Sequence, residues 1–279
     1  MGPLVRIELY KIAQKPRTYI AFAAIAAIVL LLQLALYADG ATYVGFALQS
    51  VENTFSISGR IINGYFVCFV ILQTLLVHVP LLIALVAGDS IAGESNMGTL
   101  RLLFSKPVSR SKLLLAKFIA STVYTLLLLL FMAVLALFGS LLIFGTGDLI
   151  ILKSDMIVIL DHGDVFWRYG AAFGFAALAM TTVAALAFFF SLFAENAVGP
   201  IIATMSVIIV CTILTTMDIP LFQSLKPYLF TNHMLNWKGF FERPIDGPEI
   251  ARSAGILLLH IVGLVGSTIL IARKKDILS

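Results

Sequence analysis

Charged residues are scarce in this chain. Only 12% of its 279 residues are Asp, Glu, Lys or Arg, whereas a soluble globular domain carries about 25%. Cysteine is scarcer still, because Cys68 and Cys211 are the only two and both fall within apolar stretches. A small, soft side chain packs well there and is poorly placed for oxidation. These shortages argue against a soluble domain and against a disulfide framework.

Common catalytic and nucleotide-binding motifs are also missing. The sequence has no G-x-x-x-x-G-K-[ST], no H-E-x-x-H and no G-x-S-x-G, which are the usual phosphate-loop, zinc-protease and serine-hydrolase patterns. GTGD at Gly145–Asp148 matches the short motif of intramembrane aspartyl proteases, but that chemistry needs two aspartates at close range. Asp89, the other acid beside a neighbouring span, is expected at the opposite membrane face. We therefore predict no catalytic residue, metal or bound cofactor.

Apolar residues fill the space that charge leaves. They make up 60% of the chain, and the mean hydropathy is +1.02. The stretches without any Asp, Glu, Lys or Arg are 18–38, 61–88, 118–147, 169–194, 196–217 and 253–272. Each reaches the roughly 20 residues that a helix needs to cross a bilayer. Because lipid offers no partners to backbone N–H and C=O groups, such stretches must be helical.

The expected fold class is therefore an all-α integral membrane protein with six transmembrane helices in a single domain, residues 1–279. Allowing for charged flanks, we expect these helices at about 18–38, 61–88, 113–147, 167–194, 196–217 and 251–273. The loop 89–112 joins the second and third helices, and a long segment, 218–250, precedes the sixth.

The distribution of Lys and Arg predicts the orientation. With the N-terminus inside, 12 of the 19 basic residues lie on the inner side and ten of the 15 acidic residues lie on the outer side. Membrane proteins keep Lys and Arg preferentially in cytoplasmic loops. We therefore expect both termini in the cytoplasm.

The first 17 residues are expected to form an interfacial helix. Apolar residues alternate with Arg6, Lys11 and Lys15, whose cations could meet anionic lipid headgroups. Pro16 would end this helix before the first span. A basic anchor without helical order is the alternative.

Two outer segments are expected to hold short elements. Prolines divide 218–250 and aromatic residues lie between them, which predicts short interfacial helices, or an aromatic belt that only anchors the chain. Two apolar runs within Gly147–Arg168 indicate a β-hairpin. Potential metal ligands also lie there: Asp155, Asp161, His162 and Asp164. Such spacing is common in solvated loops, which is the interpretation we favour.

Two features lie within the spans themselves. His78 and His260 have no acidic neighbour in their own spans, so we expect each to be neutral and hydrogen-bonded to another helix. Gly170 and Gly174 would permit close helix packing.

The loop after the second span has the most ordered pattern. It begins with Asp89 and Glu94, continues with an apolar stripe at helical spacing and reaches a helix-breaking Pro107. Ser109 is suited to cap the following helix. The stripe consists of Met97, Leu100, Leu103 and Phe104. It predicts a short helix that docks on a membrane or on a partner protein; a solvated turn with basic flanks is the alternative.

These residues resemble a known family. The pattern D-x-I-A-x-E-x-x-x-G-T-L-x-x-L-[LF]-x-x-P-V-S-R-x-x-L-L-x-x-K, at Asp89–Lys117, resembles the signature of type-2 ATP-binding-cassette (ABC) exporter permeases. The likeness extends to the interfacial helix, the six spans and the long segment before the last span.

This resemblance implies a permease dimer with separate cytoplasmic ABC ATPase subunits that bind the ATP. It also implies alternating access, a bacterial plasma (inner) membrane location, contacts with membrane lipids and no nucleic-acid partner. Residues 89–112 would be the coupling loop, with a coupling helix after Glu94 in a cleft of the ATPase. The implied coupling residues are Asp89, Glu94, Gly98, Thr99, Leu100, Arg101, Leu103, Phe104, Pro107, Ser109 and Arg110. A membrane scaffold or assembly factor without transport is the alternative function.

Overall fold

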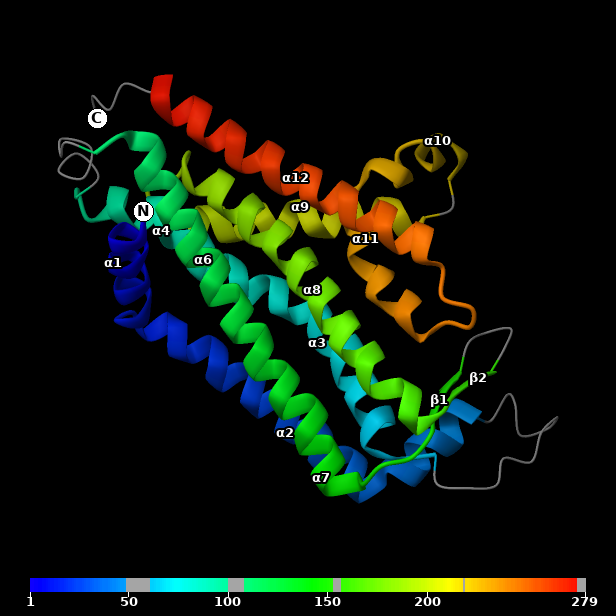
Figure 1. Ribbon diagram of the computed structural model, residues 1–279. Helices are drawn as coiled ribbons and strands as arrows, with labels where there is room; N and C mark the ends of the chain where they lie inside the picture. Colours follow the sequence, from blue (N-terminus) through cyan, green and yellow to red (C-terminus); the bar gives the residue numbers. More distant parts are fainter. Residues whose placement is uncertain (49–60, 100–107, 153–156, 218, 275–279) are drawn as a thin grey trace.

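Long apolar helices dominate the computed structural model, which describes residues 1–48, 61–99, 108–152, 157–217 and 219–274 (Figure 1). Within these residues, six helices are long and apolar enough to cross a membrane. They are contained in α2 (Pro16–Leu48), α3 with α4 (Gly64–Ala87 and Asp89–Asn96), α6 through α7 (Arg110–Phe144), α8 (His162–Ser191), α9 (Val198–Thr216) and α12 (Gly247–Lys274). The prediction of a six-helix, all-α membrane fold is confirmed.

A separate helix, α1 (Gly2–Ala13), precedes the first span. The chain turns after it, and Pro16 is the first residue of α2, a position where the missing proline N–H has no helical acceptor to lose. The prediction that Pro16 separates an N-terminal helix from the first span is confirmed. Further along, α2 bends at Asp39, whose φ and ψ are −131° and 19°.

The second span continues beyond its predicted end. Asn63 caps α3 by accepting a hydrogen bond from the N–H of Phe66 at 3.0 Å. The helix passes through Pro80 and ends at Ala87, and α4 follows after Gly88. The hydroxyl of Ser191, from α8, accepts hydrogen bonds from the N–H groups of Ile91 and Ala92, both at 2.9 Å. A side chain from another helix thus accepts the hydrogen bonds of backbone N–H groups in the first turn of α4.

The third span contains a π-helical segment, η1 (Val134–Gly139), between α6 (Arg110–Ala133) and α7 (Ser140–Phe144). Wider π-type turns disturb the regular carbonyl pairing. Gln33 of α2 supplies hydrogen bonds at this segment: its buried side-chain amide donates to the carbonyl of Leu135 and to the hydroxyl of Ser140, both at 3.1 Å. This amide is therefore a polar contact between the first and third spans.

The core of the bundle lies around α8. This helix packs against α3, α6, α9 and α12, and 61% of its most apolar window is buried, the largest share among the six spans of the described chain. Close approach occurs at Gly64 of α3, where a Cβ would lie 2.6 Å from the Cα of Leu141. The expectation for Gly170 and Gly174 was wrong, because a Cβ at either would meet nothing within 4 Å.

Two ends of the bundle are distinguishable (Figure 1). We call the end with α1, α4 and the start of α6 the charged end, and the opposite end the hairpin end. At the latter, β1 (Leu149–Leu152) pairs antiparallel with β2 (Ile157–Leu160). This confirms the predicted hairpin.

Short helices also cover part of the bundle before α12. They are α10 (Pro220–Gln223), η2 (Lys226–Tyr228), α11 (Phe230–Met234) and η3 (Leu235–Phe241). Trp237 and Phe241 of η3 are each 1% exposed, so these rings fill the protein core and do not form a lipid-facing belt. Arg168 of α8 holds η3 by donating to the carbonyls of Phe240 and Glu242 at 2.7 and 3.1 Å. The predicted short helices are thus present.

The two histidines within spans bond differently from the expectation. Nδ1 of His78 lies 2.8 Å from the carbonyl oxygen of Thr74, and Nδ1 of His260 lies 2.8 Å from that of Ile256. Each histidine therefore bonds to its own helix one turn back. The prediction of a hydrogen bond to another helix was wrong, because a carbonyl four residues earlier lies within reach of the ring.

Candidate functional site

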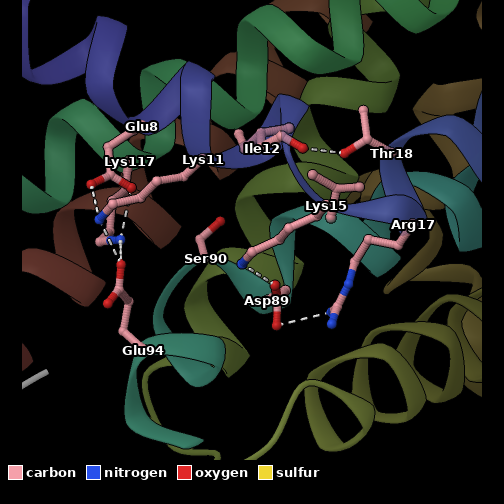
Figure 2. Close-up of a pocket in the computed structure, with 11 residues that line it drawn as sticks. Glu8, Lys11, Ile12, Lys15, Arg17, Thr18, Asp89, Ser90, Glu94 and Lys117 are labelled. Carbon is pink, nitrogen blue, oxygen red and sulfur yellow. Dashed lines mark hydrogen bonds and ion pairs between the residues drawn. The ribbon is translucent and has the colours of Figure 1, made fainter. Parts of the chain in front are cut away.

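Seven charged side chains of the described chain meet at the charged end and line one small open cavity (Figure 2). They come from α1, the turn after it, the start of α2, α4 and α6. We call them the charge cluster: Glu8, Lys11, Lys15, Arg17, Asp89, Glu94 and Lys117. The cluster joins the N-terminal helix to α4 and α6, the two helices that flank the segment 97–109.

One half of the cluster alternates two lysines with two glutamates. Nζ of Lys117 lies 2.8 Å from Glu8 and 3.2 Å from Glu94, and Nζ of Lys11 lies 3.0 Å from Glu8 and 2.8 Å from Glu94. Lys117 is only 3% exposed, so its ammonium depends on these carboxylates for compensation. Burial lowers the pKa of Lys11, but hydrogen bonds with Glu94 and Glu8 outweigh it and raise this pKa above its usual 10.5. Both lysines are therefore positioned as cationic links between α1, α4 and α6.

The other half of the cluster centres on Asp89, the first residue of α4. Its carboxylate binds Lys15 and also Arg17, whose Nη1 lies 2.9 Å from Oδ1. Gly93 leaves room for this carboxylate, because a Cβ there would lie 2.5 Å from Oδ1 of Asp89. The start of α4 is thus attached to the turn between α1 and α2.

Uncharged contacts fix α4 on its remaining sides. Ile91 belongs to a small apolar cluster with Leu114 and Phe118 of α6 and Phe188 of α8. At the other end of α4, Gly98 has a φ of +67°, a conformation that favours glycine. This turn brings the N–H of Thr99 within 3.0 Å of the Glu94 carbonyl and its hydroxyl onto the Glu94 carboxylate. The direction in which the chain leaves α4 therefore depends on the charge cluster.

Comparison with known proteins identifies the type of molecule that carries this site. Residues 3–228 match the model of a family described as ABC-2 family transporter protein, which covers α1 through η2 and includes the whole charge cluster. The chain belongs to the ABC-2 transporter family. The predicted resemblance to type-2 ABC transporter permeases is therefore confirmed, and this ABC-2 protein is a membrane component of transport.

A stretch of this ABC-2 protein is also similar to a protein from Bacillus subtilis (strain 168), described as uncharacterized protein YhcI. The two are 38% identical over 63 residues, which are 23% of this chain and 20% of the relative. The chain therefore spans about a fifth of that relative's length in the match.

Some of the predicted coupling residues of this ABC-2 protein lie within the described chain, and the rest lie outside it. Asp89 and Glu94 turn their carboxylates into the charge cluster, where they are 3% and 7% exposed, and Gly98 and Thr99 form the turn after α4. Ser109 is the N-cap residue of α6, although its side chain makes no capping hydrogen bond there. Arg110 donates to the carbonyl of Ala272 in α12 at 3.4 Å. The others lie outside the described residues: Leu100, Arg101, Leu103, Phe104 and Pro107.

The partners of the two predicted acids were not predicted from the sequence. Lys11 and Lys15 were expected to meet lipid headgroups, which stays a prediction, and each also binds a carboxylate of α4. Glu8, Arg17 and Lys117 were not predicted as site residues. The sequence signal that could have found them was the prediction that all seven residues of the charge cluster lie on the same side of the membrane. That prediction did not indicate which acid pairs with which base. Only the packing of α1 against α6 shows which pairs form.

At the hairpin end, two of the four potential metal ligands named from the sequence, Asp161 and His162, lie beside Asp148. Asp148, Asp161 and His162 have potential ligand atoms within 4.8 Å of one another, and all three are exposed. Asp148 and Asp161 accept hydrogen bonds from the backbone N–H groups of His162 and Gly163, so they shape the turn into α8. Asp164 binds Arg168, and Asp155 lies outside the described residues. Asp148 of the GTGD motif directly precedes β1 at the hairpin end, whereas Asp89 begins α4 at the charged end (Figure 1), so the two aspartates lie at opposite ends of the bundle.

Proposed function

We propose that this ABC-2 protein is the permease subunit of an ATP-driven exporter, working as a dimer with separate ATPase subunits. The observation that carries the proposal is the attachment of both flanks of the segment 97–109 to one charge cluster. A loop that only connects two spans needs no such attachment. A segment that is moved by a partner ATPase needs rigid flanks if its movement is to reach the membrane-spanning helices.

The proposed mechanism is alternating access. Binding of ATP closes the ATPase dimer and displaces the segment 97–109 together with α4 and the start of α6. Lys117 and Lys11 pass this displacement to α1 through Glu8 and Glu94, and Ser191 passes it to α8. Because α8 packs against four other spans, its movement would reorient the central pathway.

Orientation and location belong to the same proposal. The charged end would lie in the cytoplasm of a bacterium, with the protein in the plasma (inner) membrane and both termini on the cytoplasmic side. The support is the asymmetry of Lys and Arg, which favours the cytoplasmic side. The ATPase and its nucleotide would then meet the loop that follows α4.

A second copy of the chain would complete the pathway. Only 11% of the most apolar window of α9 is buried, against 61% for α8, so α9 offers a large apolar face to lipid or to another subunit. Cross-linking of the protein in membranes should therefore yield dimers. Exclusively monomeric protein in an active complex would contradict this part of the proposal.

The coupling role can be tested with variants of the apolar stripe. Leu103→Asp would bury an unpaired carboxylate against the ATPase, at a cost of a few kcal/mol, and should release the ATPase during purification. Leu103→Met keeps the apolar contact and serves as the matched control. Both variants should be compared with the wild type for co-purified ATPase and for ATP-dependent export from vesicles.

The two variants distinguish an exporter from a connector loop and from a scaffold. Loss of both ATPase and export in Leu103→Asp, with neither lost in Leu103→Met, supports the exporter. Normal export by Leu103→Asp at wild-type expression would show that this loop is only a connector. An ATPase that co-purifies while no substrate moves would favour the scaffold or assembly factor.

A further inference from the structure

The charge cluster exposes only part of its charge. The side chains of Lys11, Lys15 and Arg17 are 36%, 33% and 35% exposed. Counted over side-chain atoms alone, the three acidic residues of the cluster are 4–9% exposed, and the fourth cation, Lys117, is 2% exposed. An ion that approaches the cavity from outside therefore meets cations, although the interior is nearly balanced.

The cluster also has one cation too many. Its four cations face three carboxylates, which leaves one positive charge. The excess lies beside Asp89, because Lys15 and Arg17 share that single carboxylate, whereas Lys11 and Lys117 share two. A guanidinium carries five N–H donors, and the ion pair with Asp89 is the only one that Arg17 makes within the described chain.

Lys15 and Arg17 lie at the start of the first span, where lipid headgroups are expected. They flank Pro16, the first residue of α2. Tyr10 and Tyr19 on either side are 66% and 62% exposed, and tyrosine is enriched at this level of a bilayer. The anionic group that is abundant at this depth is the phosphate of a phospholipid.

We propose that Lys15 and Arg17 bind the phosphate of an anionic phospholipid headgroup at the turn between α1 and α2. The lipid supplies the missing negative charge of the cluster and leaves the pairs with Asp89 in place. Planar guanidinium and compact ammonium groups are both established phosphate binders. The site requires a membrane but no ATPase, so it can be tested separately from ATP-driven export.

The test is lipid binding by the purified full-length chain in neutral detergent, without ATPase. The protein is titrated with phosphatidylglycerol or with zwitterionic phosphatidylcholine, and bound lipid is counted by native mass spectrometry. Arg17→Gln and Lys15→Gln should each weaken the binding of phosphatidylglycerol about fivefold, which is the effect of about one basic residue near an anionic lipid surface. Arg17→Lys keeps the charge and should retain the preference for phosphatidylglycerol.

Arg6→Gln is the matched control, because it removes one exposed positive charge of α1 that does not line the cavity. Retention of the preference in this variant, with its loss in Arg17→Gln and Lys15→Gln, supports the site. Equal weakening in all three variants, or equal binding of the two lipids by the wild type, would overturn it. Displacement of phosphatidylglycerol by millimolar inorganic phosphate would assign the cations to a free anion and would also overturn the lipid site.

Discussion

At the scale of single residues, the charge cluster brings together side chains that lie far apart in the sequence, such as Glu8 and Lys117 at 2.8 Å. Asp89 and Glu94 stood out because they begin an ordered loop. Nothing in the sequence shows that Lys117, on the far side of that loop, returns to Glu94 at 3.2 Å. Pairing of this kind depends on how helices are rotated against one another, which local patterns do not determine.

Removal of one buried carboxylate should destabilise the protein. Glu94→Gln would leave Lys117 and Lys11 with Glu8 as their shared partner, and the loss of charged hydrogen bonds should cost about 2 kcal/mol. Thermal unfolding in detergent measures this effect, with the exposed Glu195→Gln as the control. In the double variant with Lys117→Met, the two losses should be less than additive. Full additivity would show that the two residues do not interact.

Gly93 should tolerate no side chain, despite its helical position. Alanine normally stabilises a helix relative to glycine by about 1 kcal/mol, but a Cβ here would collide with the fixed carboxylate of Asp89. Gly93→Ala should therefore lower the unfolding temperature, since overpacking costs about 1–3 kcal/mol. Gly170→Ala in α8, where a Cβ meets open space, should not. An equal or higher unfolding temperature for Gly93→Ala would mean that the Asp89 ion pairs can shift freely.

At the scale of secondary-structure elements, composition was sufficient for existence and type. Uncharged runs marked all six spans, and two short apolar runs marked the hairpin. The helical continuation of the second span beyond Gly88, as α4, and the π-helical η1 were not predictable, because both depend on tertiary partners. Ser191 stabilises the first of these, and Gln33 stabilises the second. The elements are thus encoded locally, while their irregularities are encoded by neighbouring helices.

Arg168 should control the order of the short helices at the hairpin end. Arg168→Met would leave the carbonyls of Phe240 and Glu242 without this donor, so amide hydrogen exchange across η3 should become faster. Exchange in α4, at the charged end, should not change. Arg252→Met, at an exposed position of α12, is the control. Unchanged protection of η3 would show that Trp237 and Phe241 alone hold it in place.

At the scale of the whole molecule, the division into two ends leads to a test of orientation. In a variant without Cys68 and Cys211, Asn96→Cys places an exposed thiol at the charged end and His162→Cys places one at the hairpin end. The basic residues predict that an impermeant maleimide labels only His162→Cys in intact cells. Opening the inner face should make Asn96→Cys reactive. Labelling of Asn96→Cys from outside would reverse the proposed topology.

The cluster also imposes an order on how this protein can be made. Lys15 binds an aspartate 74 residues further along the chain, and Glu8 binds a lysine 109 residues further along. A ribosome delivers α1 long before either partner exists. The ion pairs of Glu8 with Lys117 and of Lys15 with Asp89 therefore cannot form until the second and third spans have been inserted. In a nascent chain that stops before Lys117, Lys11 would be the one lysine of the cluster that pairs with Glu8 and Glu94. Insertion of the third span is therefore the step that completes the ion pairs of α1.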